Sequence, residues 1–212
     1  MARRTKEDAE ATRNKLLDAA LDVFYEKGVA GASLRDVAVA ASVTRGAIYW
    51  HFKDKMDLFG ALMTRSALPF EAALETPLDD QQGGALRQLM EVLAMVFRQV
   101  VHDPVTRRVF DIALYKVEYA GEMQAVRAWR IENMERFASR IQAFLERAAN
   151  DADVVLMQPP ISAARGLRAV FDGVLLTWLL HEQQSFDLEK EGMLAVQTYI
   201  KGLGFDMEKE FA

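Results

Sequence analysis

Cysteine is absent from the 212-residue sequence, and this absence excludes a disulfide framework and a thiolate metal site. Histidine, another common metal ligand, occurs only three times. His51, His102 and His181 lie in separate segments, and their spacing is not one that holds a metal ion. We therefore expect neither a bound metal nor a cofactor.

Long apolar runs are also missing. The longest, residues 170–180, is interrupted by Asp172, Gly173 and Thr177 and is far too short to span a bilayer. Residues 1–13 alternate in charge and lack the apolar centre of a signal peptide. We expect a soluble, cytoplasmic protein without membrane contact.

Proline and glycine are scarce, at 5 and 12 residues, and the apolar residues recur mostly at helical spacing. This pattern predicts an all-α fold of about nine helices. Gly28 is expected to cap the first helix in the left-handed conformation, and Pro69 to kink or end the fourth helix near residue 68. The expected helices cover about residues 6–27, 33–40, 45–51, 54–74, 85–101, 104–117, 122–150, 162–181 and 188–203.

The net charge of -5 argues against a nucleic-acid partner when taken alone, but the charge is unevenly distributed. Residues 1–65 hold 11 basic and 9 acidic side chains, whereas the remaining residues hold 15 and 22. A basic head on an acidic body suits a chain that presents one end to a polyanion. We expect a small N-terminal domain at residues 1–53 and a larger helical domain at residues 54–212.

Residues 33–52 are expected to form two short helices joined by a three-residue turn, which is the arrangement of a helix-turn-helix. The side chains expected to face inward are Leu34, Val37, Ala38, Val43, Ala47 and Ile48. The side chains left outward on the second helix are of the types that reach bases and phosphates, namely Thr44, Arg45, Tyr49 and His51.

The end of this motif carries aromatic and charged residues whose roles differ. Phe52 is expected in the core, and Tyr49 at a phosphate, because its hydroxyl needs a polar partner. Trp50 and His51 stay open between a structural position and a DNA contact. Lys55 is electrostatically unfavourable in the first turn of a helix, and a phosphate partner would explain it.

Residues 16–62 resemble the TetR family of transcriptional repressors. The resemblance depends on Ala19, Ala20, Phe24, Gly28, Ser33, Leu34, Val37, Ala38, Ala41, Val43, the run 44–52, Lys55 and Leu58. Residues 2–6 and 44–52 look most like the AcrR and TtgR subgroup, which represses multidrug efflux pumps. Beyond residue 65, the strings 106–108 and 172–173 and the helix order are similar to the same subgroup.

The resemblance implies a dimer that binds a palindromic operator through two heads, at residues 1–53. A small molecule would enter the body, at residues 54–212, move the fourth helix and separate the heads. The resemblance also implies phosphate contacts and a base contact. The implied phosphate contacts are Ser33, Thr44, Tyr49 and Lys55, and the implied base contact is Arg45. Pro69 departs from the family pattern inside the connecting helix.

An effector cavity in the body is expected to be largely apolar. Its expected lining is Leu93, Phe97, Phe110, Leu114, Phe137, Ile141, Phe171, Asp172, Leu175 and Trp178. Asp172 matches the acid of the Asp-Gly string in the resembling repressors and would select hydrogen-bond donors on the ligand. The alternative is that Asp172 pairs with Arg165 or Arg168 along its helix.

The stretch 170–180 is apolar on almost every side, so it needs a partner on each face. A second subunit is the simplest cover. We therefore expect a homodimer through the eighth and ninth helices, which the resemblance also implies.

The function that these patterns favour is a ligand-responsive repressor of an efflux-pump operon, released by small apolar or aromatic molecules. The alternatives are a regulator of another pathway, with a fatty acyl, signal or catabolic ligand, and a DNA-binding protein without an effector. An enzyme is not expected, because no nucleophile–base pair, paired carboxylates or phosphate loop is present.

Overall fold

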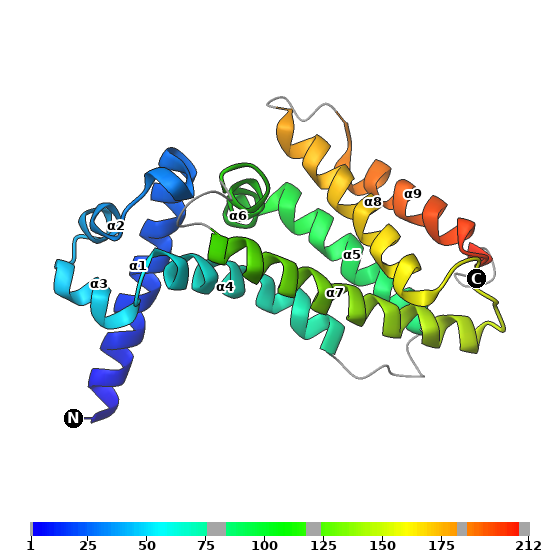
Figure 1. The fold of residues 1–212 in the computed structure, drawn as a ribbon, viewed down its shortest axis with the longest axis horizontal. Coiled ribbons are helices and arrows are strands. Elements are labelled where there is room, and N and C mark those ends of the chain that lie inside the picture. The colour runs from blue at the N-terminus through cyan, green and yellow to red at the C-terminus, as the bar shows by residue number, and fades with distance from the viewer. Residues whose placement is uncertain (1, 76–83, 118–123, 182–185, 208–212) are drawn as a thin grey trace. The chain divides into compact units, whose positions relative to one another are not determined.

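The computed structural model describes residues 2–75, 84–117, 124–181 and 186–207, and these residues form helices and turns without a β-strand. The all-α prediction is confirmed. In chain order the helices are α1 (Ala2–Gly31), α2 (Leu34–Ala40), α3 (Arg45–His51), α4 (Lys55–Glu75), α5 (Gly84–His102), α6 (Pro104–Tyr115), α7 (Gln124–Asp151), α8 (Pro160–Leu180) and α9 (Leu188–Gly202) (Figure 1).

The chain divides into two compact units. The first unit comprises Met1–Leu68 and Pro104–Trp129, so it contains α1, α2, α3 and α6. The second comprises Pro69–Asp103 and Arg130–Ala212, with α5, α8 and α9. The sequence predicts a functional boundary after residue 53, and that boundary stays a prediction.

Helix α1 bends at Gly28, whose φ of 70° and ψ of 162° form a conformation that is almost restricted to glycine. The positive φ expected at Gly28 is confirmed, but its ψ is not that of a left-handed helix cap, and the helix resumes as far as Gly31. The bend frees the Val29 amide, which donates to the Lys116 carbonyl just after α6 at 2.9 Å. The bend therefore ties α1 to α6 inside the first unit.

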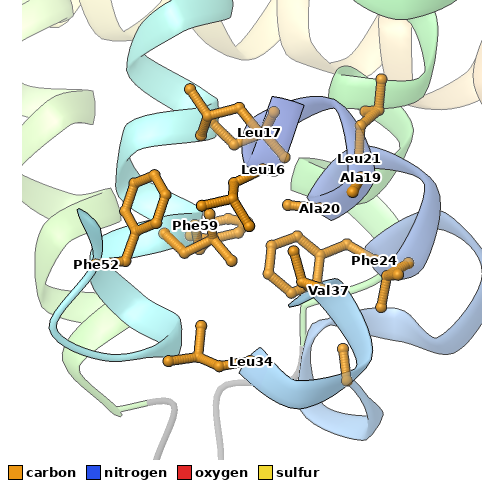
Figure 2. Packing of buried hydrophobic residues seen from close by; sticks show 14 of the residues in the cluster. Leu16, Leu17, Ala19, Ala20, Leu21, Phe24, Leu34, Val37, Phe52 and Phe59 are labelled. Carbon is orange, nitrogen blue, oxygen red and sulfur yellow. The ribbon is translucent and has the colours of Figure 1, made fainter. Parts of the chain in front are cut away.

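The core of the first unit gathers apolar side chains from α1, α2, α3 and α4 (Figure 2). Phe24 and Phe59 meet edge to face, with ring centroids 6.2 Å apart. The predicted stripe on α1 is confirmed, because Leu16, Ala20, Val23 and Phe24 are all buried. Leu34, Val37, Ala38, Ile48 and Phe52 are buried as predicted as well. This core fixes α2 and α3 against α1.

The turn between α2 and α3 passes through Ser42, which has a φ of 53°. The left-handed region costs a non-glycine residue roughly 1–2 kcal/mol, although glycine loses roughly 0.5–1 kcal/mol more entropy on folding. We therefore expect Ser42→Gly to stabilise the protein by about 0.5–1 kcal/mol in urea unfolding. Ala40→Gly, at the last residue of α2, is the control and should destabilise the protein, by at most the roughly 1 kcal/mol that glycine costs inside a helix. Equal effects of the two substitutions would contradict the argument.

The second unit packs α9 closely against α8 and α5 (Figure 1). A Cβ at Gly192 would lie 2.8 Å from the Phe97 ring, so this glycine permits the close approach of α9. Phe97 in turn stacks on Phe171 of α8, with centroids 4.6 Å apart. Two turns further along α9, the Tyr199 hydroxyl donates to the Ala163 carbonyl at 3.2 Å.

Helix α4 continues past Pro69 to Glu75. The predicted extent of this helix, to about residue 74, is therefore confirmed. Of the two effects expected of Pro69, the ending near residue 68 is wrong, and the kink stays a prediction. Proline lacks one amide donor and crowds the preceding turn, which weakens a helix but does not by itself terminate it. The boundary between the two units nevertheless falls between Leu68 and Pro69.

Candidate DNA-binding surface and effector region

The first turn of α3 presents hydrogen-bond donors. The Thr44 hydroxyl oxygen accepts from the Ala47 amide at 3.2 Å and caps the helix. Within the described ranges its hydroxyl hydrogen has no acceptor. It can therefore donate to an external oxygen such as a phosphate. The amides at this helix end also attract an anion.

The exposed face of α3 carries Arg45, Tyr49 and Trp50. Arg45 lies over the Tyr49 ring, 5.6 Å from its centroid, and pairs with no carboxylate in the part of the chain that the structure describes. Tyr49 is 50% exposed and Trp50 is 73% exposed. An exposed guanidinium beside two exposed aromatic rings is suited to the base edges and the sugar–phosphate backbone of DNA.

Several cations elsewhere in the first unit are paired with acids. Lys27 binds Asp36 at 2.7 Å, Arg65 binds Asp18 at 2.8 Å and Arg108 binds Asp22 at 2.9 Å. No described acid pairs with the exposed side chains of Arg35, in the first turn of α2, and Lys53, which follows α3. These two residues were not among the predicted DNA contacts, although cations in or next to a helix-turn-helix are a signal for phosphate contact.

Ser33 forms a capping box with Asp36 at the start of α2. The Ser33 hydroxyl donates to the Asp36 carboxylate, and the Asp36 amide donates back to the hydroxyl at 3.2 Å. Hydrogen bonds from Lys27 and Ser33 lower the pKa of Asp36 to about 2. Ser33 therefore has a structural role that uses its donor, and its implied phosphate contact stays a prediction.

Lys55 also has protein partners. Its ammonium donates to the carbonyls of Ala30 and Ala32, each at 2.9 Å. These carbonyls lie at the end of α1, so they explain a cation in the first turn of α4 without DNA. One of the three ammonium hydrogens remains for a phosphate.

His51 ends α3 and is largely uncharged at neutral pH. Burial, followed by the charge of Arg13, lowers the pKa of His51 below its ordinary value. The neutral ring can still donate a hydrogen bond, but it does not neutralise a phosphate charge. Trp50 packs edge-on against it, with centroids 4.6 Å apart. Phe52 is 1% exposed, which confirms its predicted core position.

The predicted effector residues lie in both units. Leu93, Phe97, Ile141, Phe171, Leu175 and Trp178 are buried in the second unit, and Phe137 and Asp172 are partly buried there. Phe110 and Leu114 are partly buried on α6, in the first unit. The structure brings Phe97 and Phe171 into direct contact. An open pocket in the second unit contains none of them, and its lining is Glu146, Ala149, Asn150, Leu156, Gln158, Pro159 and Pro160.

Asp172 accepts a hydrogen bond from Arg168, one helical turn earlier on α8, at 3.1 Å. Arg165, the other candidate partner, binds Glu135 of α7 at 2.7 Å instead. The alternative interpretation, in which Asp172 pairs with Arg168 along α8, therefore matches the contact in this structure. Its effector role stays a prediction.

Three leucines of α8 and α9 remain exposed on the single chain. Leu176 and Leu180 of α8 are 40% and 65% exposed, and Leu194 of α9 is 60% exposed. Leu175, in contrast, is 1% exposed and packs inside the unit. Exposed leucines on adjacent helices are typical of a protein–protein contact surface.

Two comparisons define the class of protein. Residues 16–62 match the bacterial regulatory proteins of the tetR family. Residues 84–205 match the C-terminal region of the MAATS-type transcriptional repressors. The chain is therefore a DNA-binding transcriptional regulator and not an enzyme. It belongs to the tetR family, whose members bind operator DNA, dimerise and bind small-molecule effectors.

Relatives of known identity span almost the whole chain. The transcriptional regulator AcrR of Shigella flexneri is 38% identical over 200 residues, covering 90% of this chain and 88% of AcrR. TtgR of Pseudomonas putida is 33% identical over 180 residues, covering 85% and 86%. The SmeT–triclosan complex superposes with a TM-score of 0.83 at 30% identity and covers 95% of each chain.

Among the described residues, no helix is both long enough and apolar enough to cross a membrane. The family matches confirm the class of protein that the sequence predicted, a ligand-responsive transcriptional regulator.

Proposed function

We propose that this regulator represses a multidrug efflux-pump operon by binding a palindromic operator as a homodimer. The observation that carries the DNA contact is the exposed face of α3, where Thr44 and Arg45 have donors without described acceptors. SmeT of Stenotrophomonas maltophilia represses the efflux pump SmeDEF, and NalD of Pseudomonas aeruginosa represses MexAB-OprM. Similarity to these two repressors supports an efflux-pump operon as the target.

The contacts proposed on DNA divide by chemistry. Arg45 reads a base edge in the major groove, since its planar guanidinium matches the two acceptors of guanine. The other side chains donate to phosphates, and these are Thr44, Tyr49, His51 and Lys55, together with Arg35 and Lys53. Ser33 would contact a phosphate only by turning its hydroxyl hydrogen away from Asp36. Phosphate contacts set the position of the head, and the base contact sets its sequence preference.

A gel-shift series on the DNA upstream of the gene tests the proposal. Binding should be specific for a palindrome with half-sites about 34–36 Å apart or a multiple of that spacing. An unrelated fragment of equal length is the control. Equal affinity for the two fragments would reject the proposal.

Arg45→Ala and Lys55→Ala separate base reading from positioning. Arg45→Ala should weaken binding by about 1–3 kcal/mol and relax the preference at one base pair of each half-site. Lys55→Ala should weaken binding to all sequences alike. Competition with operators substituted at single positions measures both effects. Unchanged preference in Arg45→Ala would refute its role, and so would altered preference in Lys55→Ala.

The proposed dimer interface is formed by α8 and α9. Leu176, Leu180 and Leu194 lie on the exposed sides of these helices, and a second copy would cover them. The two helices of each subunit would then form a four-helix bundle. Dimerisation places two heads on one operator, as a palindrome requires.

The proposed effector is a small, flat and mostly apolar molecule that binds the residues predicted in the sequence. Triclosan, the ligand of the SmeT complex, is an aromatic molecule of this type and is a suitable first probe. Triclosan should raise the melting temperature and release the operator, since an effector must favour the DNA-incompetent state. A protein that no aromatic ligand stabilises would instead be a regulator of another pathway, with a different class of ligand, or a regulator without an effector.

A further inference from the structure

Arg168 of α8 lies among three groups of the second unit. Its guanidinium stands over the ring of Phe137, 5.2 Å from the centroid, and its Nε donates to the Asp172 carboxylate at 3.1 Å. Its Nη1 reaches the Met134 carbonyl at 3.4 Å, which is a long contact. Phe137 and Met134 come from α7, so the cation bridges two helices of one unit.

The Arg168 side chain is held in place, but not all of its hydrogen-bond donors have partners. Arginine has five N–H donors in one plane, and two of them have partners among the described residues. The Arg168 side chain is 21% exposed, so its remaining donors are accessible to water or to a ligand. Unused donors at a fixed position are suited to an acceptor group on a ligand.

Asp172, by contrast, has its charge compensated. A cationic ligand at Asp172 would have to displace Arg168 from the carboxylate. That exchange would leave a mostly buried guanidinium without its counter-charge, which is unfavourable. An anionic or acceptor oxygen avoids this cost, because it can bind the free N–H groups while the ion pair with Asp172 stays intact.

We propose that Arg168 is the polar recognition group of the effector region and that it selects aromatic effectors with an acceptor oxygen, such as a carboxylate, a phenolate or a carbonyl. The Phe137 ring orients the guanidinium, and Asp172 is a positioning residue. This inference rests on the proposed function, since it takes the residues around Phe137 and Asp172 as the effector region. It reverses the donor selectivity that was expected from Asp172.

Three probes that share one aromatic body test the selectivity. They are 2-naphthoate, 2-naphthol and 2-naphthylmethylamine, and each is titrated calorimetrically into the full-length dimer and added to the operator complex. Naphthoate should bind and release the operator, naphthol should bind more weakly, and the amine should bind least.

Arg168→Met removes the charge at nearly equal length and should weaken naphthoate binding by about 10- to 100-fold, as expected for a hydrogen bond between charged groups. Arg165→Met, on the same helix but paired with Glu135, is the matched control and should bind naphthoate like the wild type. Asp172→Asn should retain preference for the carboxylate. Thermal unfolding of each variant checks that it is folded.

The outcomes separate this inference from the proposed function. If the amine binds in preference to naphthoate and loses its affinity in Asp172→Asn, the effector region stands and the role of Arg168 is overturned. Equal naphthoate affinity in Arg168→Met and Arg165→Met also overturns it. If none of the probes binds while operator binding persists, the proposed effector region is wrong, and the inference fails with it.

Discussion

Leu180→Arg is expected to convert the dimer into monomers. Leu180 is 65% exposed on α8, so the substitution disturbs little inside its own chain. At the proposed interface it would instead bury an unpaired charge, which costs about 3–5 kcal/mol. Sedimentation equilibrium at micromolar protein should show the monomer mass. Operator affinity should fall by about 10²- to 10⁴-fold, because the two heads no longer bind as one unit.

Val155→Arg is the matched control for this prediction. Val155 is 89% exposed in the second unit but lies outside α8 and α9, so a charge there should leave the dimer intact. Leu194→Arg, on the exposed side of α9, should behave like Leu180→Arg. A dimer that survives both leucine substitutions would place the interface elsewhere.

Operator affinity is expected to fall by roughly 10³-fold between about 50 and 200 mM salt. Arg35, Lys53 and Lys55 give three proposed phosphate cations per head, or about six per dimer. Each neutralised phosphate contributes a slope of about -0.9 in log affinity against log salt. Fluorescence anisotropy with labelled operator measures the slope.

Lys53→Ala should reduce the magnitude of that slope by about 2, because it removes one cation from each head. Arg147→Ala removes a cation from the second unit, where Arg147 pairs with Asp151, and should leave the slope unchanged. A slope near zero in the wild type would mean that binding does not depend on phosphate contacts. Equal slopes in the two variants would exclude Lys53 from the interface.

Helix periodicity predicted the first unit well. Leu16, Phe24, Val37 and Ile48 are buried where their spacing on short amphipathic helices placed them. The positive φ at Gly28 was predictable too, because few residues other than glycine adopt it. These features depend on residues close together in the chain, so the sequence pattern contains the information.

Contacts between distant residues were not predictable. Lys55 donates to carbonyls more than twenty positions earlier, and Arg165 binds Glu135 on another helix. Charge patterns show that such residues need a partner, but they do not identify the partner, because it depends on the tertiary fold. Ser33 is a related case, because a cap and a phosphate contact use the same hydroxyl.

The hydrogen bond between Val29 and Lys116 has a consequence for engineering chimaeric regulators. The first unit is discontinuous in sequence, since Pro104–Trp129 belongs with Met1–Leu68. A graft that exchanges only the N-terminal segment would join a foreign α1 to the resident α6. The amide at the Gly28 bend and the Asp22–Arg108 pair would then meet unselected partners. A functional transplant of DNA specificity therefore has to carry both segments, with crossover points near residues 68, 104 and 129.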